Sequence, residues 1–538
     1  MSRHRSMAME LPDLIESLSR PGAYPHPFED FQLHHTHISV VFLVDRYAYK
    51  IKKPVDLDFL DFTTLDKRKH YCEEEVRLNR RLASSVYLGV VPVTAENGGL
   101  RMGGDGEAVE YAVKMRRLPP QATFLARLER GALESAHVEQ LARRLATFHA
   151  AIPPDPAASR YGRFDVVAGN ARENLEQSRP HIGETISRPV FERLTELLET
   201  RLSELRPLIE ARAAEDVPRD THGDLHLDHV YLFPEREPPA DLLVIDCIEF
   251  NERFRYADPV ADAAFLAMDL VFRLRSDLAL EFTEAYLETA GDVDGRRLMP
   301  FYIAYRAAVR AKVEGMITEE GEVPEADRQA AIQRSRAYWL LALAQLEDPI
   351  HRPCLLLMGG LPGTGKTTIA DAVAERGGFS VLSADRTRKE LAGLDPRASA
   401  AADFGQGIYT AEWNRRTYSE LLRRADQGLF RGERVLVDAS FGRQANREEF
   451  FEAADRLGVP AYLFLCEASA ETVIKRLGQR PPGSTPSDAD SEIFLGAAQL
   501  WEELPRRMSQ RLCRVDTGRE PASSLEQALG YLREARLL

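Results

Sequence analysis

The chain has 538 residues, of which 44% are hydrophobic and 29% are charged, a composition that is ordinary for globular domains. At roughly 100–200 residues per domain, a chain of this length is expected to hold two to four domains. The formal net charge of −14 disfavours a nucleic acid or an anionic membrane surface as the main partner.

The cysteines and the N-terminal residues indicate the compartment. The five cysteines are scattered and form no C-x-x-C pair: Cys72, Cys247, Cys354, Cys466 and Cys513. Such a sparse, odd-numbered set is typical of free thiols in a reducing compartment. Residues 1–10 are basic but are not followed by the apolar stretch of a signal peptide, and no run of about 18 apolar residues predicts a membrane span. We therefore expect a cytoplasmic protein without a membrane partner.

The N-terminal part of the chain alternates between helix and strand patterns. The expected elements are a helix over 10–18, strands over 37–45 and 46–52 with a turn between them, a helix over 64–82 and a strand pair within 100–117. This alternation predicts a small α+β lobe over about residues 25–120.

The next part is predicted to be mostly helical and to form a large lobe over about residues 121–349. The expected helices cover 137–152, 190–214, 259–284 and 299–346, and a strand over 241–246 ends in Asp246. Pro349 and Pro353 should end the last helix, because proline cannot continue it. We therefore predict one domain over 1–349 and a second over 350–538.

A dense polar stretch over residues 221–233 allows three interpretations. His222, His226 and His229, at spacings of four and three, would share a helix face and could bind a metal. They could equally be polar caps in a loop. In the third interpretation the stretch is a kinase-type catalytic loop, in which Asp224 orients an attacking hydroxyl and Asp246 holds magnesium. A glycine inside the stretch disfavours a metal-binding helix, and the strand that ends in Asp246 favours the kinase interpretation.

The string His222-Gly-Asp-Leu-His226, followed by Val244-Ile-Asp246, resembles the aminoglycoside phosphotransferase family over about residues 30–340. The resemblance implies an α+β, bilobal, protein-kinase-like fold, with Asp224 as catalytic base and Asp246 as magnesium ligand. The family usually has asparagine where this chain has His229. His229 would then stand at the second metal position, and imidazole prefers softer metals than magnesium.

The same resemblance implies a strand lysine that anchors ATP and a helix glutamate that pairs with it. Tyr47-Ala-Tyr-Lys50 is similar to the V-A-x-K pattern and indicates Lys50, while Lys52 lies on the same strand face and stays an alternative. Glu75 is the expected partner, with Glu74 as the alternative. Ser39, in a loop that begins at residue 37, is expected to cover the phosphates.

Two further expectations from the resemblance concern the frame of this site. Residues 115–118 are expected to form the hinge between the lobes. Asp258 and Asp262 resemble structural aspartates of the family. We expect these two side chains to brace the site and not to react.

A phosphate-binding motif stands in the second domain. Residues 358–368 contain G-x-x-x-x-G-K-T, preceded by an apolar run over 354–358 that predicts a strand and followed by a helix-forming segment. Glycines let backbone N–H groups surround the phosphates, lysine adds a charge, and the threonine hydroxyl can ligate Mg²⁺. The predicted binding residues for ATP and Mg²⁺ are Gly360, Gly363, Thr364, Gly365, Lys366, Thr367 and Thr368.

Around this motif, strands over 380–383, 435–438, 461–466 and 511–515 alternate with helices, which predicts an α/β P-loop domain with a parallel sheet. Asp438 ends a strand that is typical of a second magnesium-binding motif. The domain resembles the gluconate-kinase and polynucleotide-kinase branch of P-loop proteins.

By that resemblance, Asp385 is the candidate base and Arg388 the candidate substrate clamp. The other interpretation of Asp385 is a helix N-cap. Arg476 and Arg480 are expected to lie on a lid and to neutralise charge on the transferred phosphoryl group.

These patterns predict a fusion of two ATP-dependent, Mg²⁺-dependent phosphotransferase domains that act on hydroxyls of small polar, sugar-like or aminoglycoside-like metabolites. The alternative is that one domain, more readily the N-terminal one because of His229, is a nucleotide-binding regulator of the other. A third interpretation, aminoglycoside resistance, depends only on the family name. The acidic balance disfavours polynucleotide substrates.

Overall fold

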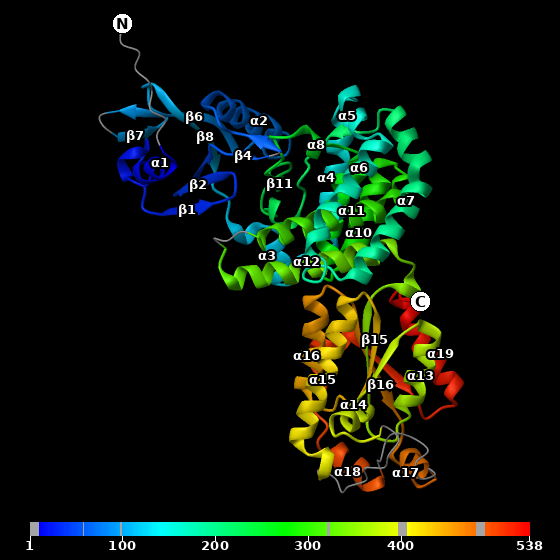
Figure 1. The fold of residues 1–538 in the computed structure, drawn as a ribbon. Helices are drawn as coiled ribbons and strands as arrows, with labels where there is room; N and C mark the ends of the chain where they lie inside the picture. Colours follow the sequence, from blue (N-terminus) through cyan, green and yellow to red (C-terminus); the bar gives the residue numbers. More distant parts are fainter. Residues whose placement is uncertain (1–9, 58, 97–98, 320–322, 396–405, 480–489) are drawn as a thin grey trace. The chain divides into compact units, whose positions relative to one another are not determined.

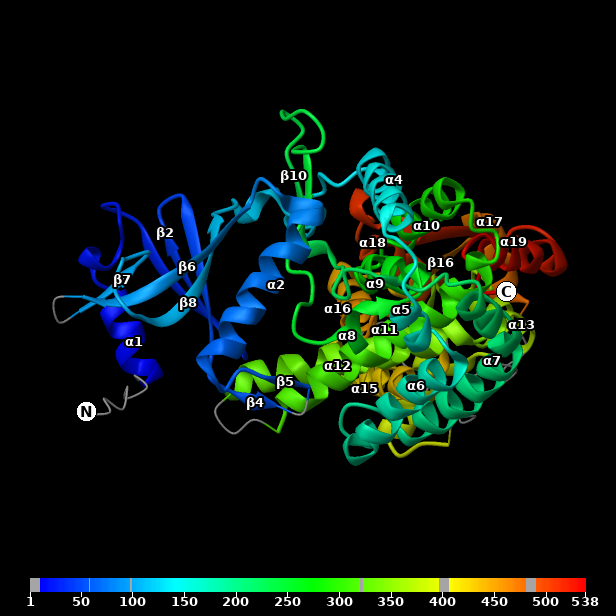
Figure 2. The same ribbon diagram turned by 90° about the horizontal axis from the view of Figure 1, so that it is seen from above.

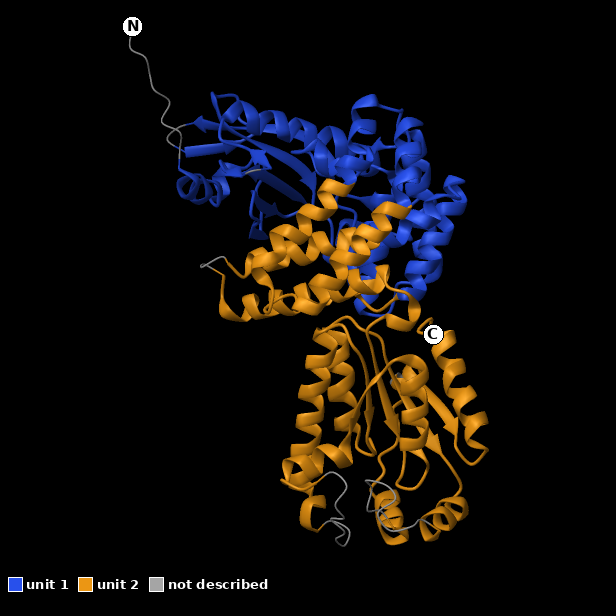
Figure 3. Cartoon of the chain, turned by 45° about the vertical axis from the view of Figure 1, so that its right-hand side comes forward, with its two compact units in different colours: residues 1–167, 205–270, 276–302 blue, residues 168–204, 271–275, 303–538 orange. Residues whose placement is uncertain are grey.

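The computed structural model describes residues 10–538 except for 58, 97–98, 320–322, 396–405 and 480–489 (Figure 1). The chain forms two compact units (Figure 3). Unit 1 holds residues 1–167, 205–270 and 276–302, and unit 2 holds residues 168–204, 271–275 and 303–538. Unit 2 thus includes segments from before residue 349, and the predicted division into domains at that residue stays a prediction.

Unit 1 contains a six-stranded antiparallel sheet of order β1-β2-β3-β8-β6-β7. Its strands are β1 (Phe31–His35), β2 (Ser39–Val44), β3 (Tyr47–Lys52), β6 (Tyr87–Glu96), β7 (Gly99–Met102) and β8 (Ala108–Arg116). The turn predicted between β2 and β3 is confirmed, and Asp45 occupies it with φ of 48°. The strands predicted within 100–117 exist but do not pair with each other, because β6 lies between them.

Each face of this sheet is covered by a helix. Helix α1 (Leu11–Leu18) shares a buried apolar cluster with Tyr49 and Ile51 of β3. Helix α2 (Leu65–Ala83) begins at Thr64, whose side chain accepts from the Lys67 N–H, and packs against β6 and β8 (Figure 2). Because side chains alternate along a strand, the even-numbered residues of β3 point toward α2. This alternation places Lys50 and Lys52 on the α2 face.

Helices make up most of the remainder of unit 1: α3 (Phe124–Glu129), α4 (Ser135–Ala151), α5 (Pro156–Tyr161), α8 (Glu252–Arg255), α9 (Pro259–Phe272) and α10 (Ser276–Ala290). The residues predicted to be helical over 259–284 form two helices, α9 and α10, which are separated at Leu274, whose φ of 58° interrupts a right-handed helix. Two short antiparallel pairs carry the site segments: β10 (Val230–Leu232) with β11 (Leu242–Val244), and β12 (Tyr256–Ala257) with β9 (Arg219–Asp220).

Four helices contribute wholly or largely to unit 2 from the middle of the chain: α6 (Phe164–Ser178), α7 (Arg188–Ala214), α11 (Gly295–Ile317) and α12 (Glu325–Leu346). The segment predicted to be helical over 299–346 forms two helices, α11 and α12. None of the described helices has both the length and the apolar character that crossing a membrane requires.

The C-terminal part of unit 2 is built on a parallel sheet of order β14-β15-β13-β16-β17, as predicted. The strands are β13 (Cys354–Gly359), β14 (Ser380–Ser383), β15 (Arg434–Asp438), β16 (Ala461–Glu467) and β17 (Leu512–Asp516). Every residue of the central strand β13 is buried, which explains its continuous apolar sequence.

Helices cover both faces of this sheet. Helices α15 (Ala411–Phe430) and α16 (Gln444–Arg456) lie on one side, and α13 (Lys366–Gly377) and α19 (Pro521–Glu534) lie on the other (Figure 1). The shorter helices are α14 (Ala384–Leu391), α17 (Ala470–Gly478) and α18 (Ser491–Gln499). Because all five strands run parallel, their carboxyl ends meet at one edge, where ligands bind in open α/β sheets.

Candidate active sites

A chain of ion pairs in unit 1 links strand β3, helix α2 and Asp246, which lies two residues after β11. Lys50 Nζ lies 2.7 Å from Asp246 Oδ1 and 3.0 Å from Glu75 Oε1. Burial would lower the pKa of Lys50, but Asp246 and Glu75 raise it well above its usual value. Burial would raise the pKa of Asp246, but Lys50 and His229 hold it well below its usual range. Both groups are therefore charged at neutral pH, and the site brings three predicted residues together.

Glu75 also binds Lys52, whose side chain is fully buried. Lys52 Nζ lies 2.8 Å from Glu75 Oε2 and makes a second ion pair with Glu249. The prediction that Lys50 and Lys52 share a strand face is thus confirmed. Lys50 retains 13% exposure of its side chain and Lys52 none, so Lys50 is the lysine that a ligand could reach. Glu74 instead makes an outward ion pair with Arg77, which rules it out as the lysine partner.

Ser39 stands at the start of β2, where its backbone pairs with Lys52. The residue is fully buried, and its Oγ finds no hydrogen-bond partner among the described residues. Its N–H donates to Thr36 Oγ1 at 2.9 Å, which fixes the turn before β2. The predicted contact of Ser39 with a nucleotide stays a prediction.

Asp262 in α9 fixes the main chain of the loop that carries Asp224. Its carboxylate accepts from the N–H groups of His222 at 3.0 Å and Gly223 at 2.9 Å, and lies 3.1 Å from His149 Nε2. Gly223 has φ of 87°, and a Cβ there would lie 2.9 Å from the carbonyl oxygen of Phe254, so this position requires glycine. The bracing role predicted for Asp262 is confirmed.

Asp258, the other aspartate predicted to brace the site, pairs with a helix arginine. Arg212 of α7 donates to both of its carboxylate oxygens, at 2.6 and 2.9 Å, and also binds Asp292. This bidentate pair joins the end of α7 to the start of α9. Asp258 thus holds the helix that carries Asp262.

The histidines of this loop do not form the helical metal site that their spacing allowed. Only Leu227–His229 form a helical turn, and it is a 3-10 turn. His222 Nε2 lies 3.0 Å from the carbonyl oxygen of Ile245. Burial lowers the pKa of His222 to about 4. This ring is therefore a neutral structural donor.

The rings of His226 and His229 pack against each other beside Asp224, with centroids 3.9 Å apart. His226 Nε2 is 3.3 Å from Asp224 Oδ2, and its Nδ1 bonds to Asp228. Burial lowers the pKa of His226, but Asp224 and Asp228 raise it to about 10. His229 Nδ1 is 2.9 Å from the Asp224 carbonyl oxygen, and Nε2 is 3.6 Å from Asp246 Oδ2. His229 thus lies between the two segments that carry the predicted site carboxylates, Asp224 and Asp246.

Helix α2 also positions both of these segments through side chains that sequence reasoning missed. Asn79 Oδ1 accepts from the Cys247 N–H at 2.9 Å, next to Asp246. Arg81 donates to the carbonyl oxygens of Asp220 and Thr221, just before the Asp224 loop. Asp246 itself has φ of 64°, a strained value for a non-glycine residue, and its N–H donates to the Tyr87 hydroxyl at 3.2 Å.

No local sequence pattern connects these residues, because Asn79 and Cys247 are separated by 168 positions. Glu249 is different, because it follows the predicted ligand Asp246 by three residues and is buried. Its position in the sequence, three residues from a predicted ligand, was the available signal for it.

Two glycines of the phosphate-binding motif in unit 2, Gly360 and Gly363, leave no room for a side chain. Gly360, Gly363 and Gly365 have φ values of 138°, 78° and 91°. A Cβ at Gly360 would lie 2.5 Å from the carbonyl oxygen of Cys466, and one at Gly363 would lie 2.8 Å from a methyl group of Val473. Close backbone approach of this kind suits a phosphate-binding loop.

The polar side chains at this loop offer an ammonium group for phosphate and oxygen atoms for a cation. Lys366 Nζ donates to the Leu361 carbonyl oxygen at 3.0 Å, and Thr367 Oγ1 donates to Asp438 Oδ2 at 2.6 Å. Burial raises the pKa of Asp438, and Lys366 and Thr367 oppose this rise. Hydroxyl and carboxylate oxygens are the ligands that Mg²⁺ prefers, so this donor set fits that cation. Thr364 is buried, and its hydroxyl donates to the Leu361 carbonyl oxygen at 2.8 Å, whereas Thr368 is exposed.

Asp385 and Arg388 lie on α14, at the same sheet edge as the glycine loop. Arg388 donates to Asp385 Oδ1 at 2.8 Å and to Asn414 Oδ1 at 3.0 Å. The guanidinium is buried, and its Nε has no partner among the described residues. The N-cap of α14 is Ser383, so the N-cap interpretation of Asp385 is wrong. Helix α14 begins at Ala384, directly after β14 ends at Ser383, so Asp385 lies inside the first turn of the helix.

Arg476 on α17 lies beside the glycine loop. Its guanidinium donates to the Thr517 carbonyl oxygen at 2.8 Å and would be 3.8 Å from a Cβ at Gly365. The other predicted lid arginine, Arg480, lies outside the described residues.

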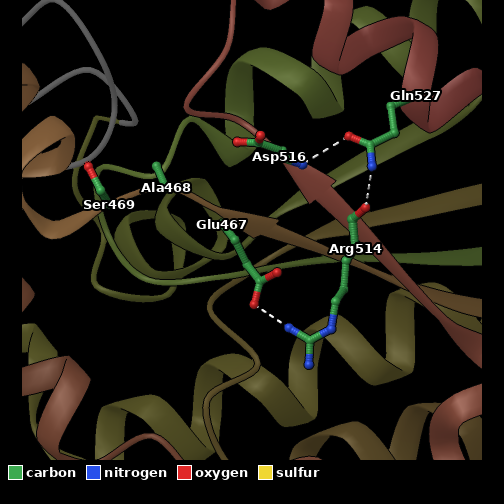
Figure 4. A pocket seen from close by; sticks show the side chains of 6 residues that line it. All are labelled: Glu467, Ala468, Ser469, Arg514, Asp516 and Gln527. Atoms are coloured by element: carbon green, nitrogen blue, oxygen red, sulfur yellow. Dashed lines mark hydrogen bonds and ion pairs between the residues drawn. The ribbon is translucent and has the colours of Figure 1, made fainter.

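A pocket of about 310 Å³ opens at the carboxyl ends of β16 and β17 (Figure 4). Its lining residues are Glu467, Ala468, Ser469, Arg514, Asp516 and Gln527. Glu467 and Arg514 form an ion pair across it. The Gln527 amide accepts from the Asp516 N–H at 3.0 Å and donates to the Arg514 carbonyl oxygen at 2.9 Å. The pocket is thus polar and lies on the same sheet edge as the glycine loop.

Known proteins resemble this chain both in parts and along its length. Residues 63–301 match the phosphotransferase enzyme family, and residues 355–504 match the AAA domain family. The uncharacterized proteins Rv2004c of Mycobacterium tuberculosis and Mb2027c of Mycobacterium bovis are each 32% identical over 518 residues, which cover 95% of this chain and 97% of theirs. Adenylate kinase isoenzyme 1 of Cyprinus carpio is 28% identical over 160 residues, 29% of this chain and 79% of that protein.

Two solved structures are distantly similar. A sugar kinase from Janibacter sp. HTCC2649 has a TM-score of 0.27 and 20% identity, over 34% of this chain and 96% of that chain. A gluconokinase from Sinorhizobium meliloti 1021 has a TM-score of 0.26 and 19% identity, over 35% of this chain and 94% of that chain. Likeness at these scores does not bear on the substrate.

Proposed function

Because this chain belongs to the same family as the mycobacterial protein Rv2004c and joins a phosphotransferase-family domain to a P-loop domain, we propose that it is a bifunctional ATP-dependent phosphotransferase. Each domain would transfer a phosphoryl group to a hydroxyl of a small polar metabolite. The observation that carries the proposal is the convergence of Lys50, Glu75 and Asp246, which His229 connects to Asp224. Phosphoryl transfer requires such a set: a lysine for phosphate oxygens, an acid for a cation and an acid for the acceptor.

In the N-terminal domain, which is proposed to be bilobal and kinase-like, Lys50 would leave Asp246 and bind phosphate oxygens of ATP. Glu75 would keep the lysine charged and extended. Asp224 would accept the proton of the acceptor hydroxyl, since its side chain is 31% exposed and open to a substrate. Asp246 and His229 would hold a divalent cation, which neutralises phosphate charge when bound.

In the P-loop domain, the backbone of the glycine loop and Lys366 would bind the phosphates of ATP. Thr367 and Asp438 would hold Mg²⁺, which supplies positive charge next to the phosphates. Asp385 would accept the acceptor proton through the oxygen that Arg388 does not hold, and Arg388 would orient the acceptor. Arg476, which lies beside Gly365, would neutralise charge that develops on the transferred group, and Arg480 would assist it.

Two observations favour a second candidate function. In the N-terminal site, Lys50 is bound to Asp246 and His229 replaces the expected amide ligand. A site of this kind that binds ATP without transferring phosphate would act as a regulator of the P-loop domain, with coupled nucleotide affinities.

The test is transfer from γ-labelled ATP into a pooled extract of metabolites and aminoglycosides. We would compare the wild type with Asp224→Asn and Lys366→Ala, and use Lys475→Ala, at an exposed lysine of α17, as the matched control. If each of the first two variants loses a different labelled product, both domains are kinases. If Lys366→Ala abolishes all transfer while Asp224→Asn changes neither products nor maximal rate, the N-terminal domain is the regulator. Transfer that survives in both variants with all products unchanged contradicts the proposal.

A further inference from the structure

The two ring nitrogens of His229 have different surroundings. Nδ1 lies 2.9 Å from the Asp224 carbonyl oxygen, which can only accept, so Nδ1 carries the hydrogen. In the neutral ring the lone pair is then on Nε2. Nε2 faces Asp246 Oδ2 at 3.6 Å, a separation too long for a hydrogen bond. The Nε2 lone pair of His229 and a carboxylate oxygen of Asp246 thus face one another with no hydrogen bond between them.

His226 does not belong to this donor pair, although one ligand atom from each of Asp224, His226 and His229 lies within 4.8 Å of the others. Both nitrogens of His226 bond to carboxylates, one to Asp224 at 3.3 Å and the other to Asp228. A ring that donates from both nitrogens has no lone pair for a cation. The donors left for a cation are one imidazole nitrogen and carboxylate oxygens.

This donor set differs from that of the P-loop domain. Thr367 and Asp438 offer only oxygen atoms, which suit Mg²⁺. Imidazole nitrogen suits first-row transition metals, whose affinity for nitrogen and oxygen sites rises from Mn²⁺ onward. We propose that Asp246 and His229 select a cation of the Mn²⁺ class over Mg²⁺, so that one chain uses two different cations. This inference deepens the proposed function and rests on it, because it concerns the cation of the N-terminal phosphotransferase site.

The test detects the nitrogen directly. The full chain carrying Lys366→Ala would be loaded with Mn²⁺ alone, and pulsed electron paramagnetic resonance would record coupling of the bound ion to ¹⁴N. We expect ¹⁴N coupling in this protein and in a further variant with His70→Asn, a substitution at an exposed histidine of α2. The coupling should disappear with His229→Asn, and the ratio of Mn²⁺ to Mg²⁺ affinity should fall about tenfold or more.

Two outcomes overturn the inference: no ¹⁴N coupling before residue 229 is changed, or coupling and an affinity ratio that survive His229→Asn. The first outcome is measured on protein that keeps His229. The inference can therefore be tested even if the His229→Asn variant does not fold. ATP binding to the Lys366→Ala protein is measured separately. Loss of ATP binding with ¹⁴N coupling intact contradicts the proposed function alone, whereas ATP binding without ¹⁴N coupling contradicts only the inference.

Discussion

Asn79 and Cys247 are joined by a hydrogen bond of 2.9 Å although 168 positions separate them in the sequence. The bond ties helix α2 to the residue after Asp246, where the backbone has φ of 64°. A strained backbone persists only when its surroundings hold it in place. Asn79 and the Tyr87 hydroxyl provide that hold, so both position the Asp246 carboxylate against Lys50.

The first prediction concerns Asn79→Ala. The substitution leaves the buried Cys247 N–H without its acceptor, so we expect the free energy of unfolding to fall by about 1–3 kcal/mol. The phosphate transfer proposed for the N-terminal domain should fall more steeply than this stability loss explains, because Asp246 loses its orientation. Urea denaturation and transfer assays on the same samples measure both effects. Lys69→Ala, at a half-exposed position of α2, is the control, and an equal effect of both variants would contradict the prediction.

The second prediction compares two adjacent glutamates. Glu75→Gln removes the charge that pairs with both buried lysines, and breaking a buried pair destabilises proteins by about 3–5 kcal/mol. Glu74→Gln breaks only the outward pair with Arg77, which stabilises the fold by about 0–1 kcal/mol. Chemical denaturation of the two variants measures the contrast. Similar losses in both would show that the lysine cluster does not depend on Glu75.

The third prediction concerns acid. Burial raises the pKa of Asp262, but the hydrogen bond and charge of His149 and the His222 N–H outweigh it and hold the pKa well below its usual range. A carboxyl with a depressed folded pKa stabilises the protein above its unfolded value of about 3.9 and loses that contribution as the pH falls further. The stability difference between the wild type and Asp262→Asn should therefore be largest near pH 7 and shrink below about pH 4. Urea denaturation at a series of pH values across this range tests the prediction. A stability difference that grows as the pH falls would contradict it.

The fourth prediction separates two glycines of unit 2. Gly360→Ala places a Cβ 2.5 Å from a carbonyl oxygen at φ of 138°, so the loop must shift and ATP affinity should fall at least about tenfold. Gly530→Ala lies within α19, where the new methyl group meets no atom within 4 Å. That control should stabilise the protein by roughly 0.5–1 kcal/mol and leave ATP affinity unchanged. Calorimetric titration with ATP measures the affinity of each variant. Equal ATP affinities in the two variants would contradict the prediction.

Sequence reasoning recovered those parts of the fold whose signals are local. The parallel sheet and its glycine loop were predicted because each buried strand is a short apolar run and the loop has a fixed spacing. Strand β6 was missed because Gly89 and Pro92 lie inside it, and both residues disfavour a strand. The structure accommodates Gly89 at an irregularity in the pairing of β6 with β8.

The same distinction applies to the N-terminal site. Asp224, Asp246 and Lys50 belong to recognisable strings, and the structure brings Lys50 and Asp246 within 2.7 Å. Asn79 and Arg81 could not be predicted, because their partners are backbone groups from distant segments, and a backbone group has no sequence signature. The ligand and catalytic roles of the predicted residues stay predictions.

The outer strand β17 carries one more consequence. An edge strand normally exposes backbone groups on which a strand from another molecule can add, and this is a route to aggregation. In this sheet the Gln527 amide occupies the Asp516 N–H and the Arg514 carbonyl oxygen, and the Tyr531 hydroxyl also bonds to that oxygen. Side chains of the final helix therefore act in place of a sixth strand. They occupy two of the backbone groups to which a strand from another molecule would have to bond, while leaving the pocket beside them open.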